Sequence, residues 1–313
     1  MLKLGLVMDP ITSINVNKDS SFAMLREAQK RCYEIHYMEI SDLYLDNDEG
    51  RARTRMLKIN HNYPFFTFSQ EKDIQLSSLN VILMRKNPPL DAEFIYATYI
   101  LERAEKQGTL IINRPQSLRD YNEKLFTTWF SGLIPDTLVT QNSDQIRKFW
   151  KKHKHIILKP LDGMGGASIF YIKPKDPNIS VIIETITHNN TRFCIAQAYL
   201  PAIKDGDKRI IIVDGKPVPY CLARIPQPGE TRGNLAAGAY SEIRNLSSED
   251  WTIIDRITPT LNQKGLIFVG LDIIGDKLTE INITSPTCIC EIEAACPISI
   301  TGMLMDSIEK NTY

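Results

Sequence analysis

The chain has 313 residues, of which 43% are hydrophobic and 24% are charged, a balance typical of a globular protein with ample material for a core. Lysine and arginine total 37, and aspartate and glutamate also total 37. This zero net charge excludes a global attraction to nucleic acid or to an anionic membrane, so we expect neither as a partner.

The length indicates two or three domains, and the cysteines indicate a reducing compartment. The six cysteines form no C-x-x-C pair, and the C-x-C of Cys288 and Cys290 is a weaker indication of a metal than of free thiols. No apolar run approaches the ~20 residues of a membrane span, and the N-terminus turns polar too early for a signal peptide. We therefore expect a cytoplasmic protein.

The first half of the chain alternates between apolar strand patterns and amphipathic helix patterns, which predicts an α/β domain with a parallel sheet. Residues 47–78 follow neither pattern and are not placed by the sequence. The predicted strands lie at 4–8, 35–40, 81–84 and 110–112, and the predicted helices at 21–31 and 92–107.

The second half has an antiparallel character that predicts an α+β domain. Asp214-Gly215 is a strong hairpin signal, and Ser247 with Asp250 forms a capping box for a helix that ends near Gly265. The change of character places the domain boundary near Asn122. We predict domains at 1–121 and 122–313, the second divided into subdomains at 122–200 and 201–313.

A glycine-rich loop follows a predicted strand at 156–158 and precedes another at 168–172. Its glycines allow the backbone to approach a phosphate, and Lys159 at the strand end supplies a positive charge. The P-loop pattern is absent, and no helix follows as in a dinucleotide-binding fold. A plain hairpin turn explains the loop equally well when it is taken alone. The loop contains Asp162, Gly163, Gly165 and Gly166.

Three oxygen-bearing side chains, Asp272, Glu280 and Asn282, are candidate magnesium ligands. Glu280 and Asn282 are two residues apart on a predicted strand and share a face. Asp272 reaches that face only if the loop between the strands has an odd length, which predicts a three-residue loop at 275–277. The alternative is a half-exposed hairpin with ordinary polar residues, although adjacent like charges disfavour it.

Two arginines and a long loop complete the candidate site. Arg209 and Arg224 lie on neighbouring strands of one predicted hairpin, and their guanidinium groups suit phosphoryl or carboxylate ligands. A solvated sheet edge is the alternative for each. The polar, glycine-spaced loop at 226–238 has the length of a lid, and disorder is its alternative. It contains Arg232, Gly233 and Gly238.

The order of these motifs resembles that of the ATP-grasp ligases, and within them the chain is similar to the bacterial glutathione synthetases along nearly its whole length. The matching runs are at 3–10, 18–24, 83–86, 159–168, 201–209 and 280–282. The resemblance implies a pre-ATP-grasp domain, then an ATP-grasp fold of two antiparallel-rich subdomains. It implies an enzyme that joins γ-glutamylcysteine to glycine through an acyl phosphate, with Mg2+ or Mn2+, and that forms a homotetramer.

The resemblance also implies roles for individual residues. Arg209 and Arg224 are expected to stabilise the acyl phosphate, and Asp272, Glu280 and Asn282 to hold the metal. The residues implied for ATP are Lys124, Lys159, Asp162, Gly163, Gly165, Gly166, Gln197, Tyr199, Leu200 and Asp207, and those for the dipeptide are Asp19, Ser20 and Arg85.

The chain departs from the family pattern at two places. Ala239-Tyr240-Ser241 stands where the family has a glycine, a basic residue and a second glycine, and Cys290 stands where it has an arginine. Two other hypotheses stay open from the sequence. One is that the chain is a different ATP-grasp carboxylate–amine ligase, and the other is that it binds a nucleotide without turnover.

Overall fold

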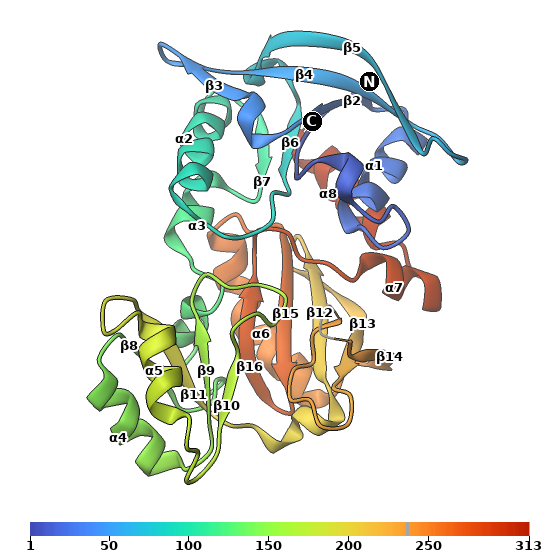
Figure 1. Ribbon diagram of the computed structural model, residues 1–313. Helices are drawn as coiled ribbons and strands as arrows, with labels where there is room; N and C mark the ends of the chain where they lie inside the picture. The colour runs from blue at the N-terminus through green and yellow to red at the C-terminus, as the bar shows by residue number, and fades with distance from the viewer. Residues whose placement is uncertain (236–237, 313) are drawn as a thin grey trace.

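The computed structural model describes residues 1–235 and 238–312 (Figure 1). Residues 236 and 237 of the predicted lid lie outside this range. The N-terminal half folds around a seven-stranded sheet in the order β3-β4-β2-β1-β6-β7, with β5 paired to β4. Its strands are β1 (Lys3–Val7), β2 (Glu34–Met38), β3 (Leu43–Asp46), β4 (Glu49–Ile59), β5 (Phe66–Gln75), β6 (Val81–Met84) and β7 (Leu110–Ile112).

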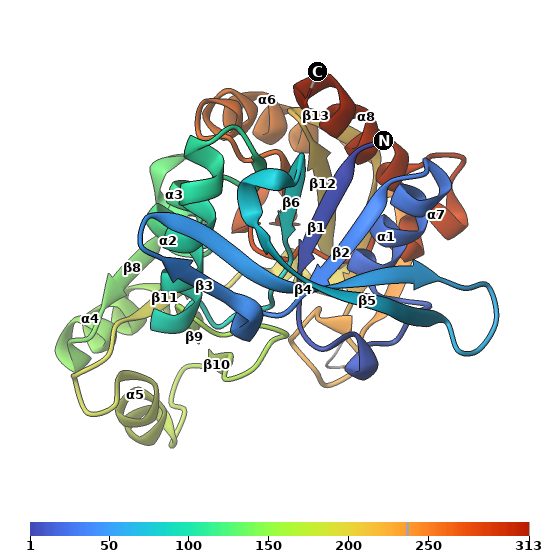
Figure 2. The same ribbon diagram turned by 90° about the horizontal axis from the view of Figure 1, so that it is seen from above.

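The centre of this sheet is parallel, as predicted, because β2, β1, β6 and β7 run in one direction. The unplaced residues 47–78 form β4 and β5, a long antiparallel hairpin that arches over the top of the molecule (Figure 1). Helix α2 (Ala92–Lys106) covers one face of the sheet and α1 (Ser20–Lys30) the other (Figure 2). Asp19 caps α1 by accepting a hydrogen bond from the Phe22 amide.

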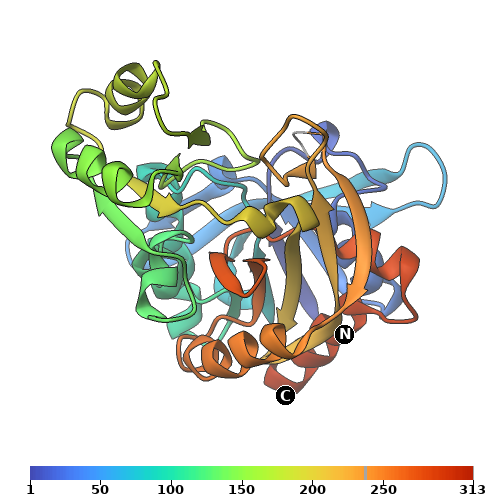
Figure 3. The same cartoon turned by 90° about the horizontal axis from the view of Figure 1, so that it is seen from below.

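The C-terminal half contains two further sheets, both antiparallel. The four-stranded sheet has the order β10-β9-β11-β8, and α4 (Ser143–His153) and α5 (Ile179–Thr187) cover one of its faces. The other face of this sheet, which α4 and α5 do not cover, is turned toward the five-stranded sheet (Figure 3). Its strands are β8 (Thr137–Thr140), β9 (Ile156–Pro160), β10 (Phe170–Ile172) and β11 (Cys194–Ala198).

The five-stranded sheet has the order β14-β13-β12-β15-β16 and packs against α6 (Ser248–Gln263). The predicted turn at Asp214-Gly215 and the Ser247–Asp250 capping box are both present. Its strands are β12 (Asp207–Val213), β13 (Lys216–Ile225), β14 (Tyr240–Asn245), β15 (Phe268–Ile274) and β16 (Lys277–Asn282). The remaining helices are α3 (Pro115–Asp120), α7 (Ile289–Ala295), α8 (Ile300–Thr312) and 3-10 turns at Ile11–Ser13, Ile40–Asp42, Leu76–Ser78, Leu125–Trp129 and Pro201–Asp205.

The last helix returns to the first. α8 lies beside α1, and the two chain ends are close together in both views (Figures 1 and 2). Arg31, which follows α1, donates to Asp306 (2.6 Å), to Glu309 (3.2 Å) and to the Gly302 carbonyl (3.1 Å). The N-terminal core on this face therefore includes the C-terminal residues of the chain.

Asn113, directly after β7, joins the N-terminal sheet to the five-stranded sheet. Its Nδ2 donates to the carbonyls of Phe268 (2.8 Å) and Ile283 (2.7 Å), and its Oδ1 accepts from the Phe268 amide (2.9 Å). One buried amide thus binds the start of β15 and the residue after β16. Within the described residues, no helix has the length and apolar character that a membrane crossing needs.

Replacing Asn113 with alanine will destabilise the protein, because three buried backbone groups lose their partner. We expect the free energy of unfolding to fall by about 3 kcal/mol, since each unsatisfied buried polar group costs about 1–3 kcal/mol. Urea unfolding of the variant measures this change. Asn17→Ala, at an exposed position, is the control and should change stability by less than about 0.5 kcal/mol. Equal effects of the two changes would contradict the bridging role of Asn113.

Candidate active site

A cavity of about 340 Å3 lies between the two C-terminal sheets. Strand alternation determines which side chains reach it. On β9, Leu158 enters the core beneath α4 and α5, whereas Ile157 and Lys159 line the cavity. On β12, Ile210 packs against the side of the sheet that carries α6, so Arg209 lies on the cavity face.

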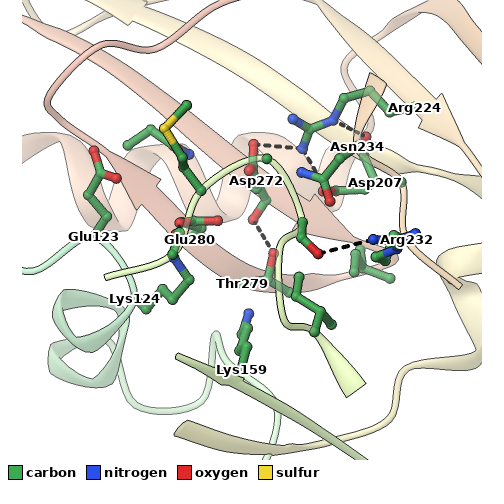
Figure 4. Close-up of a pocket in the computed structure, with 18 of the residues that line it drawn as sticks. Glu123, Lys124, Lys159, Asp207, Arg224, Arg232, Asn234, Asp272, Thr279 and Glu280 are labelled. Carbon is green, nitrogen blue, oxygen red and sulfur yellow. Dashed lines mark hydrogen bonds and ion pairs between the residues drawn. The ribbon is translucent and has the colours of Figure 1, made fainter. Parts of the chain in front are cut away.

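Asp272 occupies the centre of the cavity wall on the five-stranded sheet (Figure 4). It lies opposite Arg209 in the register of β12 and β15. Arg209 donates to both carboxylate oxygens, at 2.5 Å and 3.0 Å, and Arg224 Nη2 lies 3.0 Å from Oδ1. Burial alone raises the pKa of Asp272, but the two guanidinium groups prevail and hold that pKa well below its usual range.

Asp207 pairs with Arg224 across β12 and β13, with 2.6 Å between Oδ2 and Nη2. Its Oδ1 is buried and accepts no hydrogen bond from the described residues. Burial raises the pKa of Asp207 to about 6, and the charge of Asp272 contributes in the same direction while Arg224 opposes it. Arg224 is therefore shared by two carboxylates, and Asp272 is the more fully paired of the two because Arg209 also binds it.

The pairing of Asp272 with Glu280 is confirmed, but the predicted three-residue loop is wrong. Ile274 pairs with Lys277, so the turn contains only Gly275 and Asp276. A bulge at Thr279 supplies the additional residue instead, because Leu278 pairs with Ile273 while Glu280 pairs with Asp272. The Thr279 hydroxyl donates to the Asp272 carbonyl at 3.1 Å.

The three candidate metal ligands line the cavity together on this hairpin. Among the residues that the structure describes, no cluster of three His, Cys, Asp or Glu side chains is able to hold a metal. The candidate site therefore depends on the amide of Asn282 and on ligand oxygens. Asn282 Nδ2 donates to the Gly270 carbonyl at 3.1 Å, which leaves Oδ1 as an acceptor, and Glu280 uses only Oε1 in an ion pair. This donor set fits a hard divalent cation that phosphate oxygens also coordinate.

Lys124 connects the hairpin of β15 and β16, called the metal hairpin below, to the glycine loop. Its Nζ donates to Glu280 Oε1 at 2.9 Å and to the Gly163 carbonyl at 2.6 Å. Burial lowers the pKa of Lys124, but the charge of Glu280 outweighs it and the net pKa is raised. Lys124 therefore stays protonated while it holds both segments.

Lys159 is a buried cation without a partner in the described chain. It is 7% exposed, lines the cavity and makes no hydrogen bond or ion pair there. Burial lowers its pKa, and Glu280 only partly opposes this effect. A buried, unpaired ammonium group is costly unless an anion binds it. Figure 4 shows Lys159 and Asp272 on opposite sides of the cavity.

The glycine loop and the lid contact each other over the cavity. Arg232 of the lid donates to the Gly166 carbonyl at 3.4 Å and pairs with Glu230 at 2.6 Å. Gly166 has a φ of +82°, and a Cβ atom at this position would lie 2.5 Å from Asn234 Oδ1. Glycine is required here both by the backbone and by the close approach of the lid.

The end of β11 forms another wall, where Gln197, Tyr199 and Leu200, the residues predicted to meet ATP, line the cavity. The Tyr199 ring stacks on Tyr171, with ring centroids 4.1 Å apart. The Tyr199 amide donates to the His155 carbonyl at 3.0 Å, so this amide is already used. The adjacent Leu200 amide has no backbone acceptor in the described structure.

Several predicted residues lie away from the cavity. Asp162 is exposed and pairs with Arg192, and Gly238 lies outside the cavity lining. The predicted dipeptide residues also lie outside the cavity lining, and Ser20 and Arg85 connect segments of the fold. Ser20 accepts from the Ile289 amide (3.4 Å), and Arg85 donates to Ser21 (3.0 Å) and to the Pro286 carbonyl (2.8 Å). Gly163, Gly165, Arg232 and Gly233 all line the cavity.

The two departures from the family pattern also lie outside the lining. Cys290 follows the first residue of α7 and contacts the Asp19 carbonyl, with its sulfur 3.6 Å away. Tyr240 starts β14 and pairs with Ile225, so this change falls on a strand.

Sequence reasoning missed Glu123, Thr279 and Asn234, which all line the cavity. Glu123 adjoins Lys124 in the sequence, and this adjacency was the only available signal. Thr279 lies between two named strand positions, and Asn234 lies in the predicted lid.

Comparisons with known proteins agree on one family for almost the whole chain. The family model described as "Prokaryotic glutathione synthetase, N-terminal domain" matches residues 2–119, and "Prokaryotic glutathione synthetase, ATP-grasp domain" matches residues 123–296. The glutathione synthetase of Citrobacter rodentium is 70% identical over 310 residues, covering 99% of this chain and 98% of that protein. That of Escherichia coli is 69% identical with the same coverage.

Solved structures share the fold at much lower identity. The D-cycloserine synthetase DcsG aligns with a TM-score of 0.67 and 14% identity over 99% of each chain. The ATP-grasp ligase PsnB, in complex with a precursor variant, Mg and ADP, aligns with a TM-score of 0.65 and 17% identity over 99% of this chain and 98% of that chain. These likenesses confirm the predicted ATP-grasp fold.

Lys159→Met will stabilise the free protein while weakening nucleotide binding. Removal of an unpaired buried charge should raise the free energy of unfolding by about 1 kcal/mol or more. The affinity for ATP should fall about 10- to 100-fold, because a hydrogen bond to a charged group contributes about 1.5–3 kcal/mol. Urea unfolding and titration calorimetry measure the two effects.

The pH dependence provides a further check on Lys159. The Lys159 amino group binds its proton more tightly in the unfolded chain than in the folded chain. The free energy of unfolding of the wild type should therefore increase as the pH rises from the lowered pKa to the ordinary value of 10.5. The Met variant lacks this contribution. Lys148→Met, at an exposed position, is the control. A Lys159→Met variant that lost stability would contradict the unpaired state of the lysine.

Proposed function

This chain belongs to the prokaryotic glutathione synthetase family, and from that membership we infer that it joins γ-glutamylcysteine to glycine to form glutathione. It is an ATP-dependent carboxylate–amine ligase. The observation that carries the choice of substrates is the identity with glutathione synthetases along the whole chain. The fold alone does not decide them, because DcsG, a D-cycloserine synthetase, and PsnB, an ATP-grasp ligase solved with a precursor, both share it at low identity.

The proposed reaction has two steps. A carboxylate is a poor acyl donor, so an oxygen of the dipeptide carboxylate first attacks the γ-phosphorus of ATP and ADP leaves. The glycine nitrogen then bonds to the carbonyl carbon of the acyl phosphate, and phosphate leaves. The described residues that line the cavity supply charge stabilisation for both steps, and the proposal needs no protein nucleophile.

We assign the phosphates of ATP to the side of the cavity where Lys124 and Lys159 lie. Lys159 supports this assignment most directly, because its buried charge has no partner of its own. Arg209 and Arg224, which are held in place by Asp272, face the transferring group and offset the charge that it develops. The adenine base is assigned to the wall formed by Gln197, Tyr199 and Leu200.

A divalent cation, magnesium or manganese, fits the oxygen atoms of Asp272, Glu280 and Asn282. When bound, it would neutralise phosphate charge during the transfer. Asp272 already has both oxygens on guanidinium groups. Glu280 and Asn282 therefore offer the more available donor atoms for such a cation, whose remaining ligands would be phosphate oxygens.

The contact between Arg232 and Gly166 supports a lid that closes over the acyl phosphate. Water would hydrolyse this intermediate, so its exclusion protects the reaction. We also propose a homotetramer, as the family resemblance implies.

Release of ADP tests the proposed reaction. Purified protein with ATP and magnesium is supplied with γ-glutamylcysteine alone, with glycine alone, and with both. We expect sustained ADP release and glutathione only when both are present, and we expect a chelator to abolish them. Sustained release only with other amino acids would indicate a different ATP-grasp ligase. Nucleotide binding without release under any combination would indicate a protein without turnover.

Gly166→Ala will slow turnover, because the new methyl group meets Asn234 when the lid lies over the glycine loop. We expect kcat/KM for ATP to fall about 10-fold, from a backbone and steric cost of about 1–2 kcal/mol. Gly229→Ala is the matched control, since Gly229 has a similar φ of +87° but nothing within 4 Å of an added Cβ. Equal losses in the two variants would attribute the effect to backbone strain alone.

A further inference from the structure

Glu123 is a carboxylate that the reaction described above does not use. It follows Asn122 at the start of the C-terminal half, lines the active-site cavity and is only partly exposed. Its Oε1 accepts three hydrogen bonds, from the Ile283 amide (2.8 Å), the Thr284 amide (3.0 Å) and the Thr284 hydroxyl (2.9 Å). No donor in the described chain contacts Oε2. One oxygen is thus fixed to the end of the metal hairpin, and the other is left for a ligand.

Among the described residues, no cation contacts this carboxylate. Burial raises the pKa of Glu123, and the charge of Glu280 raises it further. Lys124 is the adjacent cation, but its Nζ already donates to Glu280 and to the Gly163 carbonyl. Figure 4 shows Glu123 beside Glu280 and Lys124, on the far side of them from Arg224. A positively charged or hydrogen-bond-donating ligand group would therefore be stabilised at Oε2.

The position of Glu123 indicates which ligand group this is. The same end of the cavity is lined by Asn87 from the loop after β6 and by Thr284 and Ser285 after β16. The residues assigned to adenine lie on the other C-terminal sheet. Of the three substrates, ATP is an anion, and the reacting end of the dipeptide is a carboxylate. The ammonium group of the dipeptide is at its other end. The amino group that must reach the reacting carbon is that of the acceptor amino acid.

We propose that Glu123 Oε2 binds the amino group of the acceptor amino acid and directs it toward the acyl phosphate. This inference rests on the proposed function. The acceptor enters as an ammonium ion, gives one proton to solvent and keeps a hydrogen bond to Glu123. Its nitrogen lone pair then forms the bond to the carbonyl carbon. The bond from that carbon to the phosphate oxygen breaks, and the second proton leaves with the phosphate.

Glu123→Gln isolates this role, because glutamine retains an oxygen to accept from Ile283 and Thr284 but presents an amide NH2 group where Oε2 lies. We expect kcat/KM for glycine to fall on the order of 100-fold, mainly through KM, as for the loss of one partner of a buried charged pair. The KM values for ATP and γ-glutamylcysteine should stay within about threefold.

Hydroxylamine provides the control reaction in the same protein. It is small and uncharged at neutral pH, and it attacks an acyl phosphate without the enzyme's help in placing an ammonium group. Formation of the dipeptide hydroxamate should therefore persist in Glu123→Gln, which also shows that the variant folds. Glu123→Asp keeps the charge and should retain more glycine activity than Glu123→Gln. Glu105→Gln removes another partly buried carboxylate, on α2, and should change neither reaction.

Three results would overturn the proposal. Equal losses of hydroxamate and tripeptide would assign Glu123 to the first step or to the metal. An unchanged KM for glycine would show that another group binds the amine. A rise confined to the KM of γ-glutamylcysteine would assign Glu123 to the dipeptide. A wild-type enzyme that forms no tripeptide would instead contradict the proposed function itself.

Discussion

The pairing of Asp272 with Arg209 and Arg224 is the interaction on which the rest of the site depends. Two guanidinium groups buried without a counter-charge would be very costly, and one carboxylate at the centre of the five-stranded sheet satisfies both. This arrangement fixes the two arginines on the cavity face in one orientation. It also uses the oxygens of Asp272, so Glu280 and Asn282 remain as the more accessible oxygen donors. Most charges of the cavity wall are consequently paired before any substrate binds, whereas Lys159 and Glu123 have no oppositely charged partner in contact among the described residues.

The second constraint is the geometry that brings these groups together. β-strands place alternate residues on opposite faces, so the same strand supplies core residues beneath the helices and charged residues toward the cavity. The bulge at Thr279 shifts this alternation by one residue and brings Glu280 opposite Asp272. Asn113 then holds the start of β15 and the residue after β16 against the N-terminal half, and Glu123 fixes the segment that follows β16. The precision of the site thus comes from strand register and from a few buried polar side chains.

The sequence was sufficient for the features that depend on local pattern. The alternation of apolar and polar residues identified the Glu280 strand, and the Asp214-Gly215 signal identified the hairpin that carries Arg209 and Arg224. The prediction of a three-residue turn after β15 was wrong because a bulge and a longer loop both place Asp272 opposite Glu280. Only the hydrogen-bond register distinguishes the two arrangements. Residues 47–78 were not placed because a bulge between Arg55 and Leu57 breaks the alternation along β4, and because β5 is mostly exposed. Glu123 was missed because its significance arises from partners about 160 residues away.

The contact between α1 and α8, which Arg31 makes, has a consequence for folding during translation. During synthesis the first 112 residues contain all the strands of the N-terminal sheet, yet one side of that sheet is completed by residues of α8, which are made much later. Arg31 meets Asp306 and Glu309 only after more than 270 further residues have been made. The amino-terminal half therefore exposes apolar surface while the later residues are synthesised. During this period chaperones or neighbouring nascent chains have access to that surface. Truncating the final helix would remove part of the first domain's core rather than an appendage at the end.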